Sequence, residues 1–280
     1  ETVHELVHSL QGMHFEVSEW YQEMDDLDDF SNYPGIRALM EAQAEWVEAK
    51  WIDSLDAYDR QTMQAQIPNI SCRVQLPNYF YIPSDLYYTY GPILSREIIN
   101  KGKMAALNEA LGEYKRTGLT NLPTSEQIYS SEKYFANERY DVIEIADVEI
   151  SNFELIDEGT IGSLDIVYLL QDTIGPIPAI TAAVGIGGGS WKDYVDPSGN
   201  LVMTVKISGD TSADLDEIYD AYILWGDTQK RFTEVVEQYN GLIYKGSTNV
   251  WISKQNGFVK MVLSQDLNII DEISSQLGDL

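Results

Sequence analysis

The chain has 280 residues, which is enough for one large or two modest domains with a hydrophobic core. It carries 45 acidic and 18 basic residues, which gives a net charge of -27. A protein this negative repels the phosphates of nucleic acid, which argues against nucleic-acid binding. Its one cysteine, Cys72, excludes an internal disulfide and a cysteine-based zinc site. No run reaches the roughly 18 apolar residues of a membrane span, so we expect membrane contact only through segments outside this chain.

The first part of the chain is predicted to be helical. Residues 1–58 have helical periodicity, interrupted by an acidic run at 23–29 and by Tyr-Pro-Gly at 33–35, which indicates two helices joined by a loop. The acidic run lacks the glycine and the spacing of an EF-hand, which favours solvation over calcium binding. One further helix is expected from Pro92 to Tyr114, followed by a loop at 117–131. A buried stripe is expected on the second helix, at Ile36, Met40, Val47, Trp51 and Leu55.

The second part is predicted to mix strands and helices. The glycines at 185 and 187–189 lack the lysine of a phosphate-binding loop and indicate a flexible turn. Strands are expected at 141–153, 191–195, 201–207, 242–244, 250–253 and 258–264, and helices at 163–171, 213–239 and 267–277. This order predicts an α+β fold with a mainly helical domain at 1–140 and an α+β sandwich as an accessory domain at 141–280.

All three histidines lie within the first 14 residues. His4-Glu5-Leu6-Val7-His8 has the spacing of the zinc-protease helix, in which two imidazoles four residues apart face one metal. Glu5, between them, is placed to take a proton from the attacking water. The alternative is a pair of surface histidines on an amphipathic helix. His14 points about 240° away from His8 on a helix, which favours packing over metal binding.

A catalytic zinc needs three protein ligands and one open position. The third ligand must be a carboxylate, because no suitable histidine remains. Glu41, Glu45 and Glu48 lie on one face of the second predicted helix at spacings of four and three. One can complete the site and another can hydrogen-bond a ligand imidazole, whereas the alternative is a solvated acidic face.

Peptide hydrolysis also needs a donor for the oxyanion, and a tyrosine hydroxyl can serve beside zinc. Tyr87, Tyr88 and Tyr90 are available, and Tyr90, next to Gly91, is our catalytic candidate. The alternative for each of these tyrosines is packing at an interface.

Several blocks of sequence occur together in this chain. They are His-Glu-Leu-Val-His-Ser-Leu-Gln-Gly-Met-His-Phe at 4–15, Arg-Ala-Leu-Met-Glu-Ala-Gln-Ala at 37–44, Tyr-Thr-Tyr-Gly-Pro at 88–92, Pro-Thr-Ser-Glu-Gln-Ile at 123–128 and Glu-Lys-Tyr at 132–134. This set resembles a family of archaeal and bacterial surface-anchored, gluzincin-like zinc metallopeptidases, and weaker likeness at 182–191 and 210–222 extends it over most of the chain. The chain departs from the family pattern at 129–131, where Tyr-Ser-Ser replaces a histidine-proline pair.

The resemblance implies a zincin-like domain at 1–140 in which Glu41 is the third zinc ligand after His4 and His8, with Glu45 beside it. It also implies export to the cell surface, a peptide or protein substrate, and strands before the first helix that are missing here. We therefore expect an N-terminally truncated metalloendopeptidase that associates with an upstream fragment or with itself. The alternative is a non-catalytic surface-assembly protein that keeps the zinc helix as structure.

Overall fold

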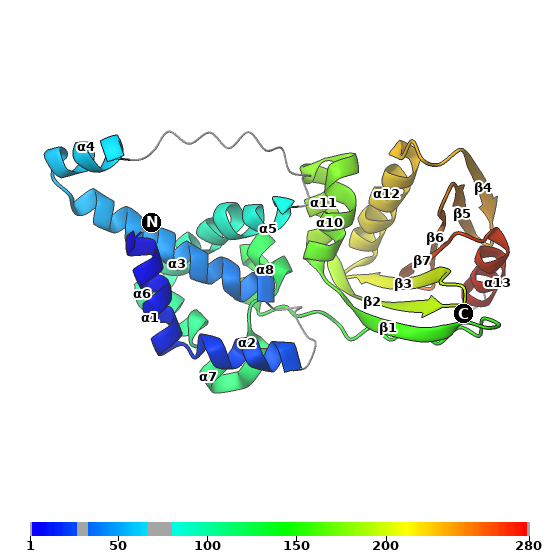
Figure 1. The fold of residues 1–280 in the computed structure, drawn as a ribbon, viewed down its shortest axis with the longest axis horizontal. Helices are drawn as coiled ribbons and strands as arrows, with labels where there is room; N and C mark the ends of the chain where they lie inside the picture. Colours follow the sequence, from blue (N-terminus) through cyan, green and yellow to red (C-terminus); the bar gives the residue numbers. More distant parts are fainter. Residues whose placement is uncertain (1, 27–32, 67–79, 279–280) are drawn as a thin grey trace. The chain divides into compact units, whose positions relative to one another are not determined.

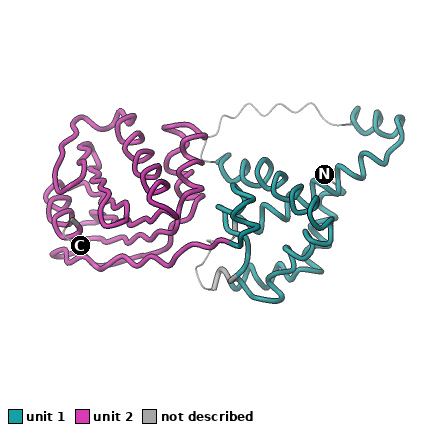
Figure 2. Tube along the Cα trace, turned by 180° about the vertical axis from the view of Figure 1, so that it is seen from behind, with its two compact units in different colours: residues 1–137 teal, residues 138–280 magenta. Residues whose placement is uncertain are grey.

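The computed structural model describes residues 2–26, 33–66 and 80–278 and divides the chain into two compact units, 1–137 and 138–280 (Figure 2). This division lies close to the boundary expected at residue 140. Unit 1 is built from helices in its described part, and unit 2 combines helices with a seven-stranded antiparallel sheet. The predicted α+β fold class is thus confirmed. Within the described ranges, no helix combines the length and the apolar character needed to cross a bilayer.

Unit 1 is organised around the long helix α3. The elements of unit 1 are α1 (Thr2–His14), α2 (Val17–Asp26), α3 (Tyr33–Ser54), α4 (Ala57–Gln66), α5 (Ile82–Asp85), the π-helical turn η2 (Leu86–Tyr90), α6 (Gly91–Leu111), α7 (Tyr114–Thr117), the 3₁₀ turn η3 (Gly118–Asn121), α8 (Ser125–Tyr129) and α9 (Ser131–Ala136). Helices α1, α6 and α8 all pack on α3 (Figure 1). The N-terminal half of α3 is therefore buried, with Ile36 and Leu39 in the core.

Two glycines allow close packing between the backbone of α3 and the backbone of neighbouring segments. A Cβ atom on Gly35 would lie 1.9 Å from the carbonyl oxygen of Pro123, just before α8. A Cβ atom on Gly91, at the start of α6, would lie 2.6 Å from the carbonyl oxygen of Ala38. Both separations are far below van der Waals contact, so only glycine permits this packing.

Unit 1 differs from the sequence expectations in three places. The expected first helix is divided into α1 and α2 at Glu16, whose φ of 55° ends the helical path. The expected apolar stripe on α3 is buried at Ile36, but Trp51 is 43% exposed because the far end of α3 extends past its neighbours (Figure 1). The loop expected at 117–131 contains η3 and α8 instead.

A capping box that the sequence reading overlooked begins α8. The backbone N–H of Gln127 donates to the Thr124 hydroxyl at 3.3 Å, and the backbone N–H of Thr124 donates to Gln127 Oε1 at 3.2 Å. In the acidic run, Glu23 accepts a 2.6 Å hydrogen bond from the Tyr114 hydroxyl. Residues 27–29 of that run, and with them part of the expected solvated segment, lie outside the described residues.

Unit 2 is a single sheet with helices on both faces. Its elements are β1 (Glu154–Ile161), α10 (Ser163–Ile174), α11 (Pro176–Val184), β2 (Ile186–Val195), β3 (Leu201–Gly209), α12 (Ser212–Thr228), β4 (Glu234–Gln238), β5 (Gly241–Lys245), β6 (Asn249–Gln255), β7 (Phe258–Ser264) and α13 (Leu267–Gly278). The strand order is β1-β2-β3-β7-β6-β5-β4, and every neighbouring pair is antiparallel. The strands expected at 191–195, 201–207, 242–244, 250–253 and 258–264 and the helix expected at 267–277 are confirmed.

The two faces of the sheet have different coverings, because neighbouring residues of a strand point to opposite sides. Helices α10 and α12 lie on one face and α13 on the other (Figure 1). The α13 face holds a core of Trp251 and Val262 from the strands with Ile270 and Ile273 from the helix.

Three expectations for unit 2 are wrong. Residues 141–153 form no strand, although Val148 and Ile150 are buried against the sheet. The helix expected up to residue 239 ends at Thr228, and β4 follows. The glycines of 185–189 are not a flexible turn, since 187–189 lie within β2; a Cβ atom on Gly188, where φ is 156°, would lie 2.3 Å from the Asp141 carbonyl oxygen.

Candidate metal centre

Helices α1 and α3 bring three potential ligands together. His4 and His8 are one helical turn apart on α1, and their Nε2 atoms lie 3.0 Å from each other. Oε2 of Glu41, on α3, lies 3.2 Å from Nε2 of His4 and 3.3 Å from Nε2 of His8. The structure thus unites His4, His8 and Glu41 across 37 residues of sequence.

The spacing of these three atoms fits a tetrahedral zinc ion. Ligand atoms at 2.0–2.1 Å from such an ion are themselves about 3.3 Å apart. The three observed separations, 3.0, 3.2 and 3.3 Å, are close to that value. Two imidazoles and one carboxylate are also a ligand set of catalytic zinc sites. The chemistry and the geometry of the donors therefore both suit zinc.

Glu41 is the most enclosed member of the cluster, with 7% of its surface exposed. Its Oε2 atom accepts a 3.0 Å hydrogen bond from the Tyr88 hydroxyl, and its Oε1 atom lies 3.6 Å from Nε of Arg37. Burial, together with the hydrogen bond and the charge of Glu41, raises the pKa of Tyr88 to about 12. Tyr88 therefore remains a hydrogen-bond donor throughout the neutral range.

A buried chain of amides fixes the orientation of His8. The side-chain nitrogen of Gln11 donates to the Met40 carbonyl oxygen and to Oε1 of Gln43, both at 2.9 Å. The Gln11 Oε1 atom therefore faces Nδ1 of His8, at 2.7 Å, as an acceptor. This bond places the imidazole hydrogen on Nδ1 and directs the Nε2 lone pair toward the cluster, as ligand histidines require.

The chain of amides continues through Gln43 to α6. The Gln43 side-chain nitrogen donates to Oδ1 of Asn108 at 2.6 Å, so α1, α3 and α6 are joined behind the histidines. Gln11 and Gln43 are 1% and 6% exposed, respectively. Buried amides require partners, and here they find them in one another.

The other carboxylates of the expected site lie on the same two helices as the cluster. Glu5 is exposed on α1 directly after His4. Glu45 lies one turn beyond Glu41 on α3, and burial raises the pKa of its carboxyl; the charges of Glu41 and Glu48 add to the rise, while His4 opposes it. His14 lies at the end of α1 and is not a member of this group, but it is exposed there, so the packing expected for it is not seen.

Tyr90, the catalytic candidate from the sequence, makes no contact with His4, His8 or Glu41 in the described part of the chain. Its ring packs edge-on against Tyr129 with 4.9 Å between centroids, and burial and the charge of Asp85 raise the pKa of its hydroxyl. The tyrosine that contacts the cluster is Tyr88. The two residues lie in the π-helical turn η2, where the wider turn changes the directions in which successive side chains point.

The sequence reading overlooked Gln11, Gln43 and the specific role of Tyr88. A signal was present for Gln11, because a polar residue three positions after His8 lies on the same helix face as that histidine. No comparable signal distinguishes Tyr88 from its neighbours, since the choice depends on η2.

Comparison with known proteins adds no relative: no family model, no curated protein and no solved structure matches this chain.

Proposed function

We propose that the chain is a zinc-dependent metalloendopeptidase of the gluzincin type. The convergence of His4, His8 and Glu41 at separations of 3.0–3.3 Å carries this proposal. Within the described residues this group has three protein ligands, whereas a structural zinc site is closed by four. Three ligands leave one position for the reacting molecules, which favours a catalytic site. Zinc held there would act as a Lewis acid toward the scissile carbonyl and would make water more acidic.

Residues of the chain supply the general base, the hydrogen-bond donor to the oxyanion and the positioning of a ligand histidine. Glu5 takes the proton of the attacking water and passes it to the leaving amine nitrogen, a role that its exposed position next to His4 permits. Tyr88 turns its single hydroxyl hydrogen from Glu41 Oε2 to the carbonyl oxygen as negative charge develops there. We assign this role to Tyr88 in place of Tyr90 because of its contact with Glu41. Gln11 keeps His8 in the ligand tautomer.

The cellular setting forms part of the same proposal. The sequence blocks that resemble surface-anchored peptidases support an extracellular location at the cell surface and a peptide or protein substrate. The net charge of -27 argues against nucleic acid as a partner.

One observation favours the alternative, a surface-assembly protein. Helix α1 exposes Leu6, Leu10 and Met13 to 58%, 53% and 77%, and their spacing puts them along one side of the helix. Exposed apolar stripes of this kind are typical of interaction surfaces. In this alternative the zinc cluster would only stiffen α1 against α3, and Glu5 would be dispensable.

Peptide cleavage measured together with zinc content separates the two functions. The wild-type chain loaded with zinc is compared with Glu5→Gln, His4→Ala and the control Glu19→Gln, which changes an exposed glutamate on α2. Glu5→Gln should keep the metal and lose about 10²- to 10⁴-fold in rate, because only the base is removed. His4→Ala should lose the metal and the activity together, while Glu19→Gln should resemble the wild type.

Two results would overturn the peptidase. One is a fully zinc-loaded wild type that cleaves nothing in a diverse peptide library. The other is a Glu5→Gln variant that cleaves as fast as the wild type. The assembly function would then be tested by light scattering on Leu10→Gln, with loss of self-association as the expected result.

A further inference from the structure

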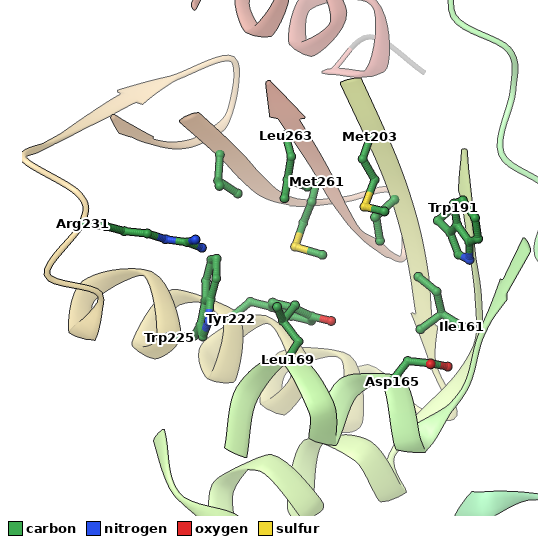
Figure 3. Close-up of a pocket in the computed structure, with 12 residues that line it drawn as sticks. Ile161, Asp165, Leu169, Trp191, Met203, Tyr222, Trp225, Arg231, Met261 and Leu263 are labelled. Carbon is green, nitrogen blue, oxygen red and sulfur yellow. The ribbon is translucent and has the colours of Figure 1, made fainter. Parts of the chain in front are cut away.

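Unit 2 contains an apolar cavity of about 270 Å³ between the sheet and helices α10 and α12 (Figure 3). Met203 and Met261 project into it from β3 and β7, with Leu263 next to them and Leu169 opposite on α10. All of its lining residues belong to unit 2, so the cavity is complete within that unit. Its chemistry is independent of the metal centre and of the function proposed above.

A guanidinium without a carboxylate partner lies at one end of the cavity. Arg231 is held over two aromatic rings, 5.3 Å from the centroid of Trp225 and 5.1 Å from that of Phe232. In the described part of the chain no carboxylate pairs with it, although acidic residues outnumber basic ones by 45 to 18. A positioned cation that has no internal anion, next to an apolar cavity, suits the carboxylate of a ligand.

A tyrosine hydroxyl lies further along the cavity. Tyr222, on α12, is 2% exposed, and no described residue hydrogen-bonds to its hydroxyl. Figure 3 shows this hydroxyl directed along the cavity, away from Arg231 and toward the side of Asp165. Since Tyr222 lines the cavity, its hydroxyl can donate a hydrogen bond to a ligand oxygen there. Burial, and then the charge of Asp165, raises the pKa of Tyr222, so the group stays a donor.

The far end of the cavity is acidic. Asp165 accepts a 2.8 Å hydrogen bond from the backbone N–H of Gly162 through Oδ2, which holds its carboxylate at the start of α10. A negative charge at this end repels the anionic group of a ligand and accepts a hydrogen bond from a hydroxyl. The cavity therefore has a cationic end, an apolar middle and an end that accepts and donates hydrogen bonds.

We propose that this cavity binds a hydroxyaryl carboxylate. The carboxylate pairs with Arg231, and the aromatic ring lies between the methionines, whose sulfur atoms make favourable contacts with ring edges. The ligand hydroxyl accepts from Tyr222 and donates to Asp165. A compact ring with two polar ends suits the size of the cavity, since sites for drug-sized ligands start at about 300 Å³.

Three probes test the polarity of the cavity in the full chain. They are 4-hydroxyphenylacetate, phenylacetate without the hydroxyl, and tyramine with an ammonium in place of the carboxylate. Binding is followed by NMR chemical-shift changes of the indole N–H groups of Trp191 and Trp225, which line the cavity. We expect 4-hydroxyphenylacetate to bind with a Kd of about 1 mM, the affinity range of small fragments, phenylacetate to bind more weakly, and tyramine to bind most weakly.

Two variants assign the ends of the ligand. Arg231→Gln should weaken 4-hydroxyphenylacetate about tenfold or more, the loss expected for one charge-assisted pair, while Arg116→Gln in unit 1 should change nothing. Tyr222→Phe should weaken 4-hydroxyphenylacetate but leave phenylacetate unchanged, and it should not lower the melting temperature because the removed hydroxyl is unpaired. Tighter binding of tyramine, equal binding of both acids, or no saturable binding of any probe would overturn the proposal.

Discussion

The side-chain oxygen of Gln11 lies 2.7 Å from Nδ1 of His8, on the side of the imidazole opposite the Glu41 carboxylate. Because the nitrogen of the same amide is held by Met40 and Gln43, Gln11 presents an acceptor to the ring and cannot turn to present a donor. Gln11, which is not itself a candidate ligand, thus sets the orientation of the candidate ligand His8.

Removing Gln11 should weaken zinc binding without abolishing it. Such second-layer partners typically affect metal affinity about 10- to 100-fold, so we expect a loss of that size for Gln11→Ala in competition with a chromophoric chelator. Gln64→Ala, an exposed glutamine on α4, is the matched control. Unchanged zinc affinity in Gln11→Ala would show that His8 does not need this hydrogen bond.

The stoichiometry of zinc tests the ligand assignment directly. We expect one zinc per chain in the wild type, retained by His14→Ala and lost by His8→Ala and Glu41→Ala, because only the latter two remove donor atoms from the cluster. The measurement is metal content by atomic emission after dialysis. Zinc loss in His14→Ala with retention in Glu41→Ala would contradict this set of ligands.

The two tyrosines of η2 should differ in catalysis. Tyr88→Phe removes the hydroxyl that contacts Glu41 and should lower the rate of peptide cleavage about 10²- to 10³-fold with zinc retained, as loss of one oxyanion donor does in other hydrolases. Tyr90→Phe should stay close to the wild-type rate, because Tyr90 packs on Tyr129. The reverse order of rates would restore Tyr90 as the donor.

The close approach at Gly35 makes that residue sensitive to a single methyl group. Gly35→Ala would put Cβ against the Pro123 carbonyl, and we expect unit 1 to lose about 1–3 kcal/mol in free energy of unfolding, as overpacked sites do. Gly12→Ala meets nothing within 4 Å and should gain up to about 1 kcal/mol from helix propensity. Hydrogen exchange in peptides from α1 and α3 measures both changes. Equal exchange in the two variants would refute the steric argument.

The carboxyl of Asp196, in the turn between β2 and β3, should titrate at a lower pH than an ordinary aspartate. Asp196 accepts from the side chain and the backbone N–H of Asn200 and from the backbone N–H of Ser198, and these bonds hold the pKa of its carboxyl below 3.8. A lowered pKa means that the stabilisation is present above pH 3.8 and is lost as the pH falls through the folded-state value.

Carboxyl NMR of this aspartate gives the measurement. Asn200→Ala should raise its titration midpoint toward 3.8, because the Asn200 side chain is the largest cause of the shift. Asn268→Ala, which removes an equivalent amide from Asp266, should leave the midpoint of Asp196 where it was. A midpoint that does not move in Asn200→Ala would contradict the assigned cause.

The sequence predicted those parts of the structure that depend on local pattern. The four-residue spacing of His4 and His8 suffices to place both rings on one side of a helix, and alternation in 201–207 and 258–264 suffices for β3 and β7. Spacing within α3 could not choose among its glutamates, because the choice depends on where α1 crosses that helix. The resemblance supplied Glu41, and the distances place it with the two histidines.

The failures have physical reasons of the same kind. Alternation in 141–153 arises because Val148 and Ile150 pack on the sheet, and packing alone does not form a hydrogen-bonded ladder. Strand β1 was missed because nearly all of its residues are exposed, so it lacks the pattern of a half-buried strand. The contact of Tyr88 with Glu41 depends on the π-helical turn η2, which the local sequence pattern does not predict.

Strands β1 and β4 end the sheet of unit 2, and their outer edges carry backbone groups that could pair with a strand of another molecule. Both strands are acidic, with Glu154, Asp157 and Glu158 in β1 and Glu234 and Glu237 in β4. Two copies that approached edge to edge would bring these carboxylates together, and their repulsion opposes the fibril-like stacking to which open sheets are prone. The acidic residues of the two edge strands thus oppose strand pairing between copies of the protein. This repulsion weakens in acid, where the carboxylates take up protons.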